Sequence, residues 1–549
     1  MNANILLRAG IVPVVVTVAT VATMVTLATR PTNLLAATTC EAKSLQAVAP
    51  ADTTIVSAEL QQAPVAHCKV DGFITTTNPG PNKNHFRLQL PEKSLWNSRY
   101  YFIGMGGTAG YVPTESQIPR GNPIVKGYAV AGTDTGHQGP TLDWSFYSDP
   151  AKALDHAHRG AHLTAVATQK MTKAYYAADR MYRYHTGCSG GGRMGMEAIQ
   201  AHPGDYDGVL IGWPGGRHTD PKKTGTNFPI QVKEMTREPG SWLSPAKRAF
   251  AEKQVVEACD MADGAKDEMI WDHRKCTFDF NTLKCAAGDR PDCLTQPEIA
   301  SINSLLEHTA MPISNMTGWS FLGQEPPPWD PSPAPENAAK TSAALVIQTT
   351  WARTYLGQEN RDIVKHPLTK AELHWVEDMQ AKMSFATPVK TDLSPFEKLG
   401  GKALFFVGVG DPCCSNVANE NFFKDVITAM GAARVATFAT LYQIPGWGHC
   451  GGGTGPTDGQ DTMLEALVDW VEKGKTPHAI EMHRGADRAR LLFASAGATS
   501  SGVPVPQPTG PSRDFLVCPF PYVSVFDSSK ATVPGAVYEG EHWSCQRPR

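Results

Sequence analysis

The sequence lacks an excess of either charge. Its 50 lysine and arginine residues stand against 53 aspartate and glutamate residues, so the formal net charge of the 549-residue chain is −3. Proteins that bind nucleic acid or anionic membrane surfaces usually carry a clear positive excess. The sequence also lacks an internal repeat, a heptad run and any block of like charge, which argues against solenoids and coiled coils. We therefore expect no nucleic-acid partner.

Cysteine motifs for zinc are also missing. Twelve cysteines are present, but no Cys-x-x-Cys pair lies near a matching second pair, as a structural zinc site of that kind needs. An even number of cysteines in an exported chain indicates disulfides, although their connectivity stays open at the level of sequence. Four candidate pairs are separated by short loops: Cys40 and Cys68, Cys259 and Cys276, Cys285 and Cys293, Cys518 and Cys545.

The one long apolar run lies at the N-terminus. Residues 2–8 are weakly basic, and residues 12–28 are almost wholly apolar or small. Leu35-Ala36-Ala37 follows and can be a cleavage site for a signal peptidase. This pattern predicts that residues 1–37 are a signal peptide, that the protein is secreted or periplasmic, and that no stable membrane association follows signal removal. The alternative is an uncleaved anchor, because the run is near the minimum spanning length.

The rest of the chain has a globular composition, with 41% hydrophobic and 19% charged residues. Short apolar segments alternate with segments of helical periodicity, which predicts an α/β fold whose parallel sheet is covered on both faces. We expect strands at residues 100–103, 128–132, 208–211 and 402–409, and helices at 162–176 and around 463–471.

The middle of the chain is rich in proline, tryptophan and charge and has no regular alternation. We expect residues 38–216 and 400–549 to form one catalytic core and residues 217–399 to be inserted as a lid. The lid is favoured because the candidate active-site residues lie on both sides of this stretch. The alternative is a separate domain with its own partner.

A nucleophile motif stands at Gly187-Cys188-Ser189-Gly190-Gly191. In a Gly-x-Ser-x-Gly elbow the serine occupies a sharp strand-to-helix turn, so its neighbours must be small. Residues 182–185 can form the strand and residues 192–199 the helix. The alternative is an ordinary glycine-rich loop without a catalytic role. The predicted strand and helix on either side favour Ser189 as a nucleophile.

A nucleophilic serine needs a base, and the base needs an acid that orients it. In α/β-hydrolases the order along the chain is serine, acid, histidine. Asp411 follows a predicted strand directly and His449 lies in a turn-rich loop, so both fit this order. Asp458 and Asp461 are less suitable acids, because they are placed to start the following helix, where aspartate is a common cap.

Cysteines flank two of these residues. Cys188 precedes Ser189 and Cys450 follows His449. Because a nucleophile and its base come within hydrogen-bond reach, their neighbours can be close enough for a disulfide. For the oxyanion of an acyl-transfer intermediate, the backbone N–H of Gly190 is one donor and the glycine-rich residues 104–107 supply another.

Together these residues resemble the tannase and feruloyl esterase family, which also contains the enzyme that hydrolyses mono(2-hydroxyethyl) terephthalate. The likeness covers most of the mature chain and includes residues 133–137, 208–215 and 445–453. It implies an α/β-hydrolase fold with a large lid, a triad of Ser189, Asp411 and His449, and a disulfide between Cys188 and Cys450. It also points to Gly107 as the second oxyanion donor, with Gly106 as the alternative.

A cluster of carboxylates lies inside the predicted lid. Asp260, Asp263 and Asp267 fall within eight residues, and hard oxygen ligands in a compact loop suit calcium. The spacing is not that of an EF-hand, and a solvated acidic turn is the alternative. The family resemblance implies a structural calcium site with backbone carbonyls from Ala265 and Met269 and a disulfide between Cys259 and Cys276.

The activity implied is hydrolysis of aromatic carboxylic esters, such as feruloyl or galloyl esters, so the expected partner is a small aromatic ester. A terephthalate monoesterase, a serine peptidase or amidase on the same fold, and a binding protein on an inactive scaffold are the alternatives. The vicinal pair Cys413-Cys414 departs from the family, and the oligomeric state is not indicated. Five aromatic residues either line a substrate pocket or form lid core: Trp319, Phe321, Trp329, Trp351 and Tyr355.

Overall fold

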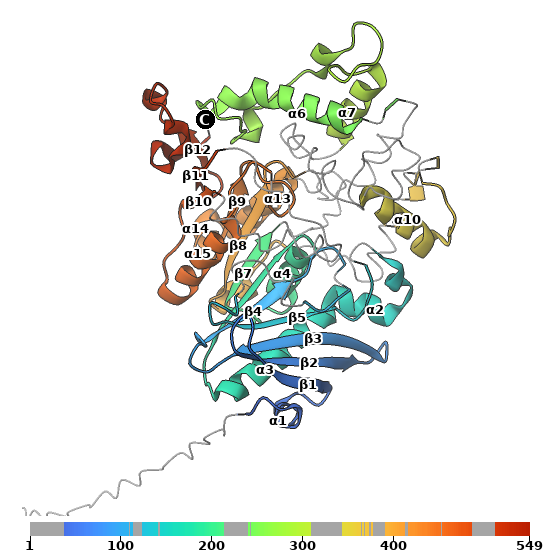
Figure 1. Ribbon diagram of the computed structural model, residues 1–549, viewed down its shortest axis with the longest axis vertical. Coiled ribbons are helices and arrows are strands. Elements are labelled where there is room, and N and C mark those ends of the chain that lie inside the picture. Colours follow the sequence, from blue (N-terminus) through green and yellow to red (C-terminus); the bar gives the residue numbers. More distant parts are fainter. Residues whose placement is uncertain are drawn as a thin grey trace, which may run out of the picture. The chain divides into compact units, whose positions relative to one another are not determined.

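A nine-stranded sheet organises the protein (Figure 1). The strand order is β1-β2-β3-β5-β4-β6-β7-β8-β9. The strands are β1 (Thr53–Gln61), β2 (His67–Thr76), β3 (Asn82–Pro91), β4 (Arg99–Gly104), β5 (Ala129–Thr133), β6 (Tyr182–Cys188), β7 (Gly208–Gly212), β8 (Lys402–Gly408) and β9 (Ala439–Ile444).

The structure is a computed structural model. It describes residues 38–108, 110–113, 123–140, 143–212, 240–241, 243–308, 343–363, 365–366, 368–369, 371–372, 375–376, 390–411, 416–451, 453–485 and 511–548. The predicted signal segment, the Cys413-Cys414 pair, Trp319, Phe321 and Trp329 lie outside these ranges.

The prediction of a parallel sheet is correct for β4 to β9 and incomplete for the N-terminal part. Neighbouring strands from β5 to β9 pair in parallel, whereas β1, β2 and β3 form an antiparallel meander that joins β5. The physical reason is the short connections after β1 and β2, because a parallel pair needs a crossover of a dozen or more residues.

Helices and C-terminal hairpins cover the two faces of the sheet. The alternation of side chains places Val209, Ile211 and Phe405 in one apolar core and Leu210 and Phe406 in the other. The first core also receives side chains from α1 (Ala42–Val48), α3 (Gly160–Tyr176), α4 (Gly190–Ala201) and α13 (Asn416–Met430). The second receives them from α15 (Gly459–Lys473), β10 (Ile480–Arg484), β11 (Arg513–Val517), β12 (Val523–Phe526) and β13 (Trp543–Gln546).

The chain leaves the sheet after β7 and returns at β8, the adjacent strand. Between them lie α6 (Pro245–Cys259), α7 (Gln296–His308), α10 (Ala343–Leu356) and the short α12 (Ser394–Lys398). Residues 243–302 have an apolar core of their own, which includes Val255, Phe280 and Ile299. None of the described residues between β7 and β8 adds a strand to the sheet, so the two strands pair directly.

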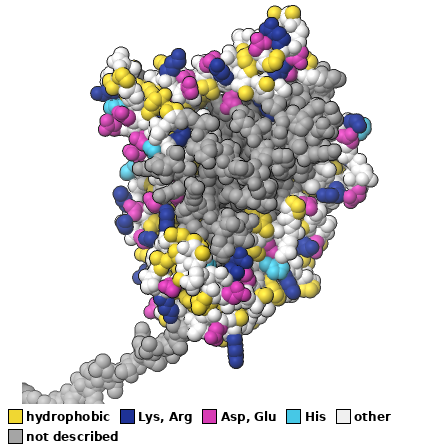
Figure 2. Space-filling model, viewed as in Figure 1, with side chains coloured by type: hydrophobic (Ala, Val, Ile, Leu, Met, Phe, Trp, Pro, Cys, Tyr) yellow, Lys and Arg dark blue, Asp and Glu magenta, His cyan; other side chains and the backbone are white. Residues whose placement is uncertain are grey.

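Among the described cysteines there are five disulfides, and they join the pairs that the sequence suggested. Cys188 bonds to Cys450 across 262 residues of sequence, whereas the other four close loops of 8 to 28 residues. Among the described helices, none combines the length and the apolar character needed to cross a bilayer. On the described part of the face in Figure 2, acidic and basic side chains are interspersed.

Candidate active site

Ser189 occupies a sharp turn between β6 and α4. Its backbone has φ 58° and ψ −120°, which is uncommon for a residue with a side chain. The Ser189 N–H donates to the Gly212 carbonyl at 2.9 Å, and α4 begins at the next residue. This is the strained strand-to-helix geometry of a nucleophile elbow, in which the hydroxyl is presented at the carboxyl edge of the sheet.

The glycines of the elbow are required by close packing of backbone on backbone. A Cβ at Gly187 would lie 2.4 Å from the Gly191 carbonyl carbon, and a Cβ at Gly191 would lie 2.2 Å from the Gly104 carbonyl oxygen. Real Cβ atoms do not approach backbone this closely, so larger residues would push the elbow away from β4. The Gly-x-Ser-x-Gly pattern is thus explained by the space around Ser189.

Asp411 and His449 are in contact. The His449 Nδ1 lies 2.9 Å from the Asp411 Oδ2, and the Asp411 side chain is 1% exposed. Because an ionised carboxylate only accepts hydrogen bonds, the Nδ1–H is the donor, which leaves Nε2 of the neutral ring as an acceptor. The alternative acid Asp458 instead accepts a hydrogen bond from the His483 backbone N–H at 2.7 Å.

Backbone contacts hold the acid loop against the histidine loop. Gly410 N–H donates to the Trp447 carbonyl at 2.9 Å. A Cβ at Gly408 would lie 2.4 Å from the same carbonyl oxygen. The Gln460 side chain, one residue into α15, donates to the Cys450 carbonyl at 2.6 Å. These contacts fix the backbone on both sides of His449 and so help to position its side chain.

The Cys188–Cys450 disulfide joins the elbow to this loop. The two Cα atoms are 5.8 Å apart, and each cysteine is the sequence neighbour of a candidate catalytic residue. The structure therefore brings the Ser189 turn and the His449–Asp411 pair to one place, at the carboxyl ends of β6, β8 and β9.

Gly107 lies against Gly190. A Cβ at Gly190 would be 2.1 Å from the Gly107 oxygen and 3.0 Å from its nitrogen. Gly107 has φ 57°, in the left-handed region that glycine adopts readily. A Cβ at Gly106, in contrast, would meet nothing within 4 Å. The two backbones that the sequence offered as oxyanion donors are thus adjacent, and Gly107 is the closer of the two loop candidates.

The Asp260–Asp267 loop is buried and rich in oxygen. Asp260, Asp263 and Asp267 are 4%, 5% and 6% exposed. Asp260 Oδ1 accepts from the backbone N–H of Asp267 and Met269 at 2.9 and 3.3 Å, so the loop folds around this carboxylate. Asp263 Oδ1 accepts from the Ala265 N–H at 3.0 Å.

Burial raises the pKa of Asp263 to about 7 and also raises the pKa of Asp267. The buried oxygen Asp267 Oδ1 has no hydrogen-bond partner among the described residues. Buried carboxylates are stabilised by a positive partner. A hard cation therefore fits the chemistry of this loop.

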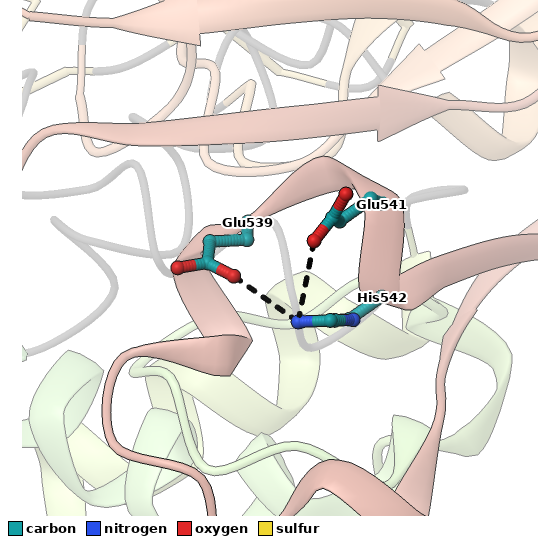
Figure 3. A group of neighbouring side chains, drawn as sticks. All are labelled: Glu539, Glu541 and His542. Carbon is teal, nitrogen blue, oxygen red and sulfur yellow. Dashed lines mark ion pairs between the residues drawn. The ribbon is translucent and has the colours of Figure 1, made fainter.

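A second group of side chains that could ligate a metal consists of Glu539, Glu541 and His542 (Figure 3). Their donor atoms all lie within 4.8 Å of one another. Within the described chain Asp260, Asp263 and Asp267 do not form so tight a set. The Glu539 and Glu541 side chains are 56% and 79% exposed and pair with the His542 Nε2 at 3.1 and 3.8 Å. These are surface ion pairs, which contribute little to stability.

Two of the five aromatic residues from the insertion lie within the described ranges. Trp351 and Tyr355 are 6% and 8% exposed. Trp351 lies edge-on to Trp144, with ring centroids 6.2 Å apart, and Tyr355 lies 6.3 Å from Tyr147. Their burial against Trp144 and Tyr147 favours the lid-core interpretation of these two residues over pocket lining.

Sequence reasoning missed Gln460 and Arg513. Gln460 holds the loop after His449, and Arg513 pairs with Asp267 at 2.8 Å, with both side chains fully buried. No local motif marks either residue, since each reaches its partner only through the tertiary fold. A pairing of Arg513 with an acidic loop nearly 250 residues earlier has no signal in a single sequence.

The sheet and the strand-turn-helix at Ser189 define an α/β-hydrolase. Two solved structures share this fold at low identity. Feruloyl esterase B from Aspergillus oryzae matches with a TM-score of 0.70 and 22% identity, covering 92% of this chain and 99% of that chain. Tannin acyl hydrolase from Aspergillus niger matches with a TM-score of 0.67 and 18% identity, covering 93% and 97%.

The chain belongs to the tannase and feruloyl esterase family, whose model matches residues 68–536. Its relatives include probable feruloyl esterase B-2 of Aspergillus terreus, 29% identical over 76% of this chain and 78% of the relative. Feruloyl esterase C of Talaromyces stipitatus is 26% identical over 76% and 78%. The expected family and fold are confirmed, and the protein is a carboxylic ester hydrolase.

Proposed function

We propose that the protein is an exported serine esterase that hydrolyses esters of phenolic acids through a Ser189–His449–Asp411 triad. The observation that carries this proposal is that the disulfide links the His449–Asp411 pair to the turn that holds Ser189. The His449–Asp411 hydrogen bond is 2.9 Å long, and the disulfide joins the neighbours of Ser189 and His449. A base oriented by a buried acid next to an elbow serine is the arrangement for acyl transfer.

In this mechanism Ser189 Oγ attacks the ester carbonyl carbon while His449 Nε2 accepts the hydroxyl proton. Asp411 holds the ring in the tautomer that accepts this proton and stabilises the imidazolium that results. The alcohol leaves with the proton from Nε2, and an acyl-serine forms. Water then loses a proton to Nε2 and attacks the acyl carbon, which releases the acid and restores Ser189.

The backbone N–H groups of Gly190 and Gly107 are the proposed donors to the oxyanion. Gly190→Ala would bring a Cβ 2.1 Å from the Gly107 oxygen, so the two backbones must separate. Because both donors must point to one oxygen, we expect kcat to fall about 100- to 1,000-fold with a smaller change in KM. Steady-state kinetics on an aromatic methyl ester measures this effect.

Gly106→Ala is the matched control, because a Cβ there would meet nothing within 4 Å. We expect it to keep kcat within a few-fold of the wild type. Equal kcat values for the wild type and a folded Gly190→Ala variant would show that Gly107 and Gly190 are not the donors to the oxyanion.

The acyl group is proposed from the names of the relatives, which are feruloyl esterases and a tannin acyl hydrolase. The deciding experiment compares methyl ferulate, methyl gallate and mono(2-hydroxyethyl) terephthalate with matching anilides. Turnover of a phenolic ester without turnover of its anilide supports a phenolic acid esterase. Preference for the terephthalate ester or for an anilide would select one of the two alternative activities.

Calcium is proposed as a structural ion in the insertion, with no part in the ester chemistry. Asp260, Asp263 and Asp267 would supply side-chain oxygens, and Ala265 and Met269 would supply carbonyls. The buried Asp267 Oδ1, which has no hydrogen-bond partner in the part of the chain that the structure describes, supports this assignment. The Cys259–Cys276 disulfide closes the loop.

Removal of calcium by a chelator should therefore lower Tm, and calcium addition should restore it, because an ion bound only by the folded state stabilises it by mass action. Differential scanning calorimetry measures the change, and kcat at a temperature where both forms are folded should stay within about twofold. An unchanged Tm after metal analysis has verified removal would reject the site.

Export is proposed from the apolar N-terminal run together with the five disulfides, which form in oxidising compartments. N-terminal sequencing of protein recovered outside the cytoplasm should begin near residue 38. Recovery of the full-length chain in the membrane fraction would instead indicate an anchor.

A further inference from the structure

Arg513 is a buried cation in contact with the calcium loop. It lies on β11, more than 200 residues after α6 in the sequence. Its Nη2 is 2.8 Å from Asp267 Oδ2, and neither side chain is exposed to solvent. The same Nη2 donates to the Val537 carbonyl at 3.1 Å. A charge without access to water is stable only where a partner of opposite charge compensates it.

Aromatic rings enclose the Arg513 guanidinium. A flat, weakly hydrated cation is suited to this surrounding, because ring faces attract positive charge. The guanidinium carbon lies within 4.7 to 6.0 Å of four ring centroids, those of Trp271, Phe515, Tyr538 and Trp543. Trp271 also donates its indole N–H to Asp267 Oδ2 at 3.0 Å, so the cation and its cage meet at one carboxylate.

The charges of the loop do not balance through Arg513 alone. Asp260, Asp263 and Asp267 are three carboxylates, all less than 7% exposed. Arg513 compensates one of these negative charges. The two that remain match the charge of one divalent cation. Among the described residues Asp267 Oδ1 has no hydrogen-bond partner, whereas Oδ2 contacts Arg513.

We propose that Arg513 is a built-in counter-cation of the calcium loop, which balances the loop together with the ion and couples ion binding to the C-terminal strands. This inference rests on the proposed calcium site. The coupling is physical, because β11 pairs with β10 and the disulfide Cys518–Cys545 closes the segment that carries Tyr538 and Trp543. An ion that orders Asp267 thereby also orders the cage around Arg513.

The test is the dependence of Tm on calcium in Arg513→Met, with Arg484→Met as the matched control. Arg484 is a second buried arginine, 4% exposed, with its guanidinium 5.7 Å from the same Phe515 ring. Its Nε donates to the Pro511 carbonyl rather than to Asp267. Metal content is measured for each protein before and after chelation.

We expect calcium to raise Tm at least twice as much in Arg513→Met as in the wild type. Removal of the arginine takes one positive charge from both states. In the ion-free state three ionised carboxylates then repel one another, whereas calcium still offsets two of them in the bound state, so at a pH where the aspartates are ionised the ion-free state is destabilised more. Arg484→Met should change the calcium response much less than Arg513→Met, because Arg484 donates to the Pro511 carbonyl and acts on Asp267 only at longer range. Arg513→Lys keeps the charge and should restore a calcium response close to that of the wild type.

Equal losses of Tm with and without calcium in Arg513→Met would overturn the inference and leave an ordinary buried ion pair. Should Arg513→Met fail to fold, hydrogen exchange of the wild type decides. Calcium must then slow amide exchange in β11 and leave β1 unchanged, and the absence of protection in β11 refutes the coupling. A wild type that retains no calcium and shows no change in Tm would instead refute the calcium site itself.

Discussion

Ser189→Ala is expected to lower kcat/KM for ester hydrolysis by about 10⁴- to 10⁶-fold, because members of a catalytic triad act as a unit. Without the hydroxyl, no acyl-serine forms and His449 has no proton to accept. Tm should change little, since alanine fits the small elbow and removes only one partly exposed oxygen. Initial rates on methyl ferulate or methyl gallate, at high enzyme concentration, measure the residual activity.

Ser148→Ala is the matched control. Ser148 is an exposed serine whose hydroxyl donates to the Ser145 carbonyl, and its loss should leave kcat/KM unchanged. His449→Ala added to Ser189→Ala should reduce the rate little further, since the second loss comes from a unit that is already inactive. Near-normal turnover by folded Ser189→Ala would mean that another residue is the nucleophile.

Removal of the Cys188–Cys450 disulfide is expected to reduce both stability and turnover. In the chain-entropy model a cross-link across so long a loop contributes about 4 to 5 kcal/mol to the free energy of unfolding. Its geometric effect is separate. With both cysteines replaced by alanine, the covalent link is lost and His449 is held near Ser189 only by non-covalent contacts, among them its hydrogen bond to Asp411 and the hydrogen bond from Gln460 to the Cys450 carbonyl. Small displacements of a base are costly to rate, so kcat should fall by about 10- to 100-fold.

Replacement of Cys285 and Cys293 by alanine provides the control, because this disulfide closes an 8-residue loop in the insertion. It should cost about 2 to 3 kcal/mol by the same model and leave kcat unchanged. Both variants are compared at a temperature where circular dichroism shows them folded. A kcat that is equal in the two variants would show that the Cys188–Cys450 bond stabilises the fold without positioning His449.

Local sequence patterns predicted most elements around the site. The apolar run of β8 is buried on both faces and needs no alternation, and the spacing of Met463, Leu464 and Leu467 gives α15 its buried face. The glycines next to Ser189 are required because the tight turn leaves no room for larger side chains, and this requirement can be recognised from a few neighbouring residues. The order of Ser189, Asp411 and His449 predicted a common site because parallel strands bring their carboxyl ends to one edge.

Patterns of this kind failed where the outcome depends on partners far along the chain. The antiparallel pairing of β1 to β3 follows from loop lengths and from which strand edge is left open, and strand periodicity is the same in either direction. The choice between Gly106 and Gly107 depends on which backbone meets Gly190. Both glycines are equally permissive in local conformation. The family resemblance favoured Gly107, and in the packed structure Gly107 is the glycine that lies against Gly190.

By itself, the sequence determined the class of the protein, since the α/β alternation and the elbow at Ser189 depend on residues a few positions apart and the family resemblance is the sum of such local motifs along the chain. The tertiary structure alone decided how distant groups are paired. It placed Gln460 under the His449 loop and set Arg513 inside an aromatic cage against Asp267. A buried charge or a single hydrogen bond gains its free energy only when water is excluded and the partner stands at the right distance, and both conditions are set by the fold as a whole.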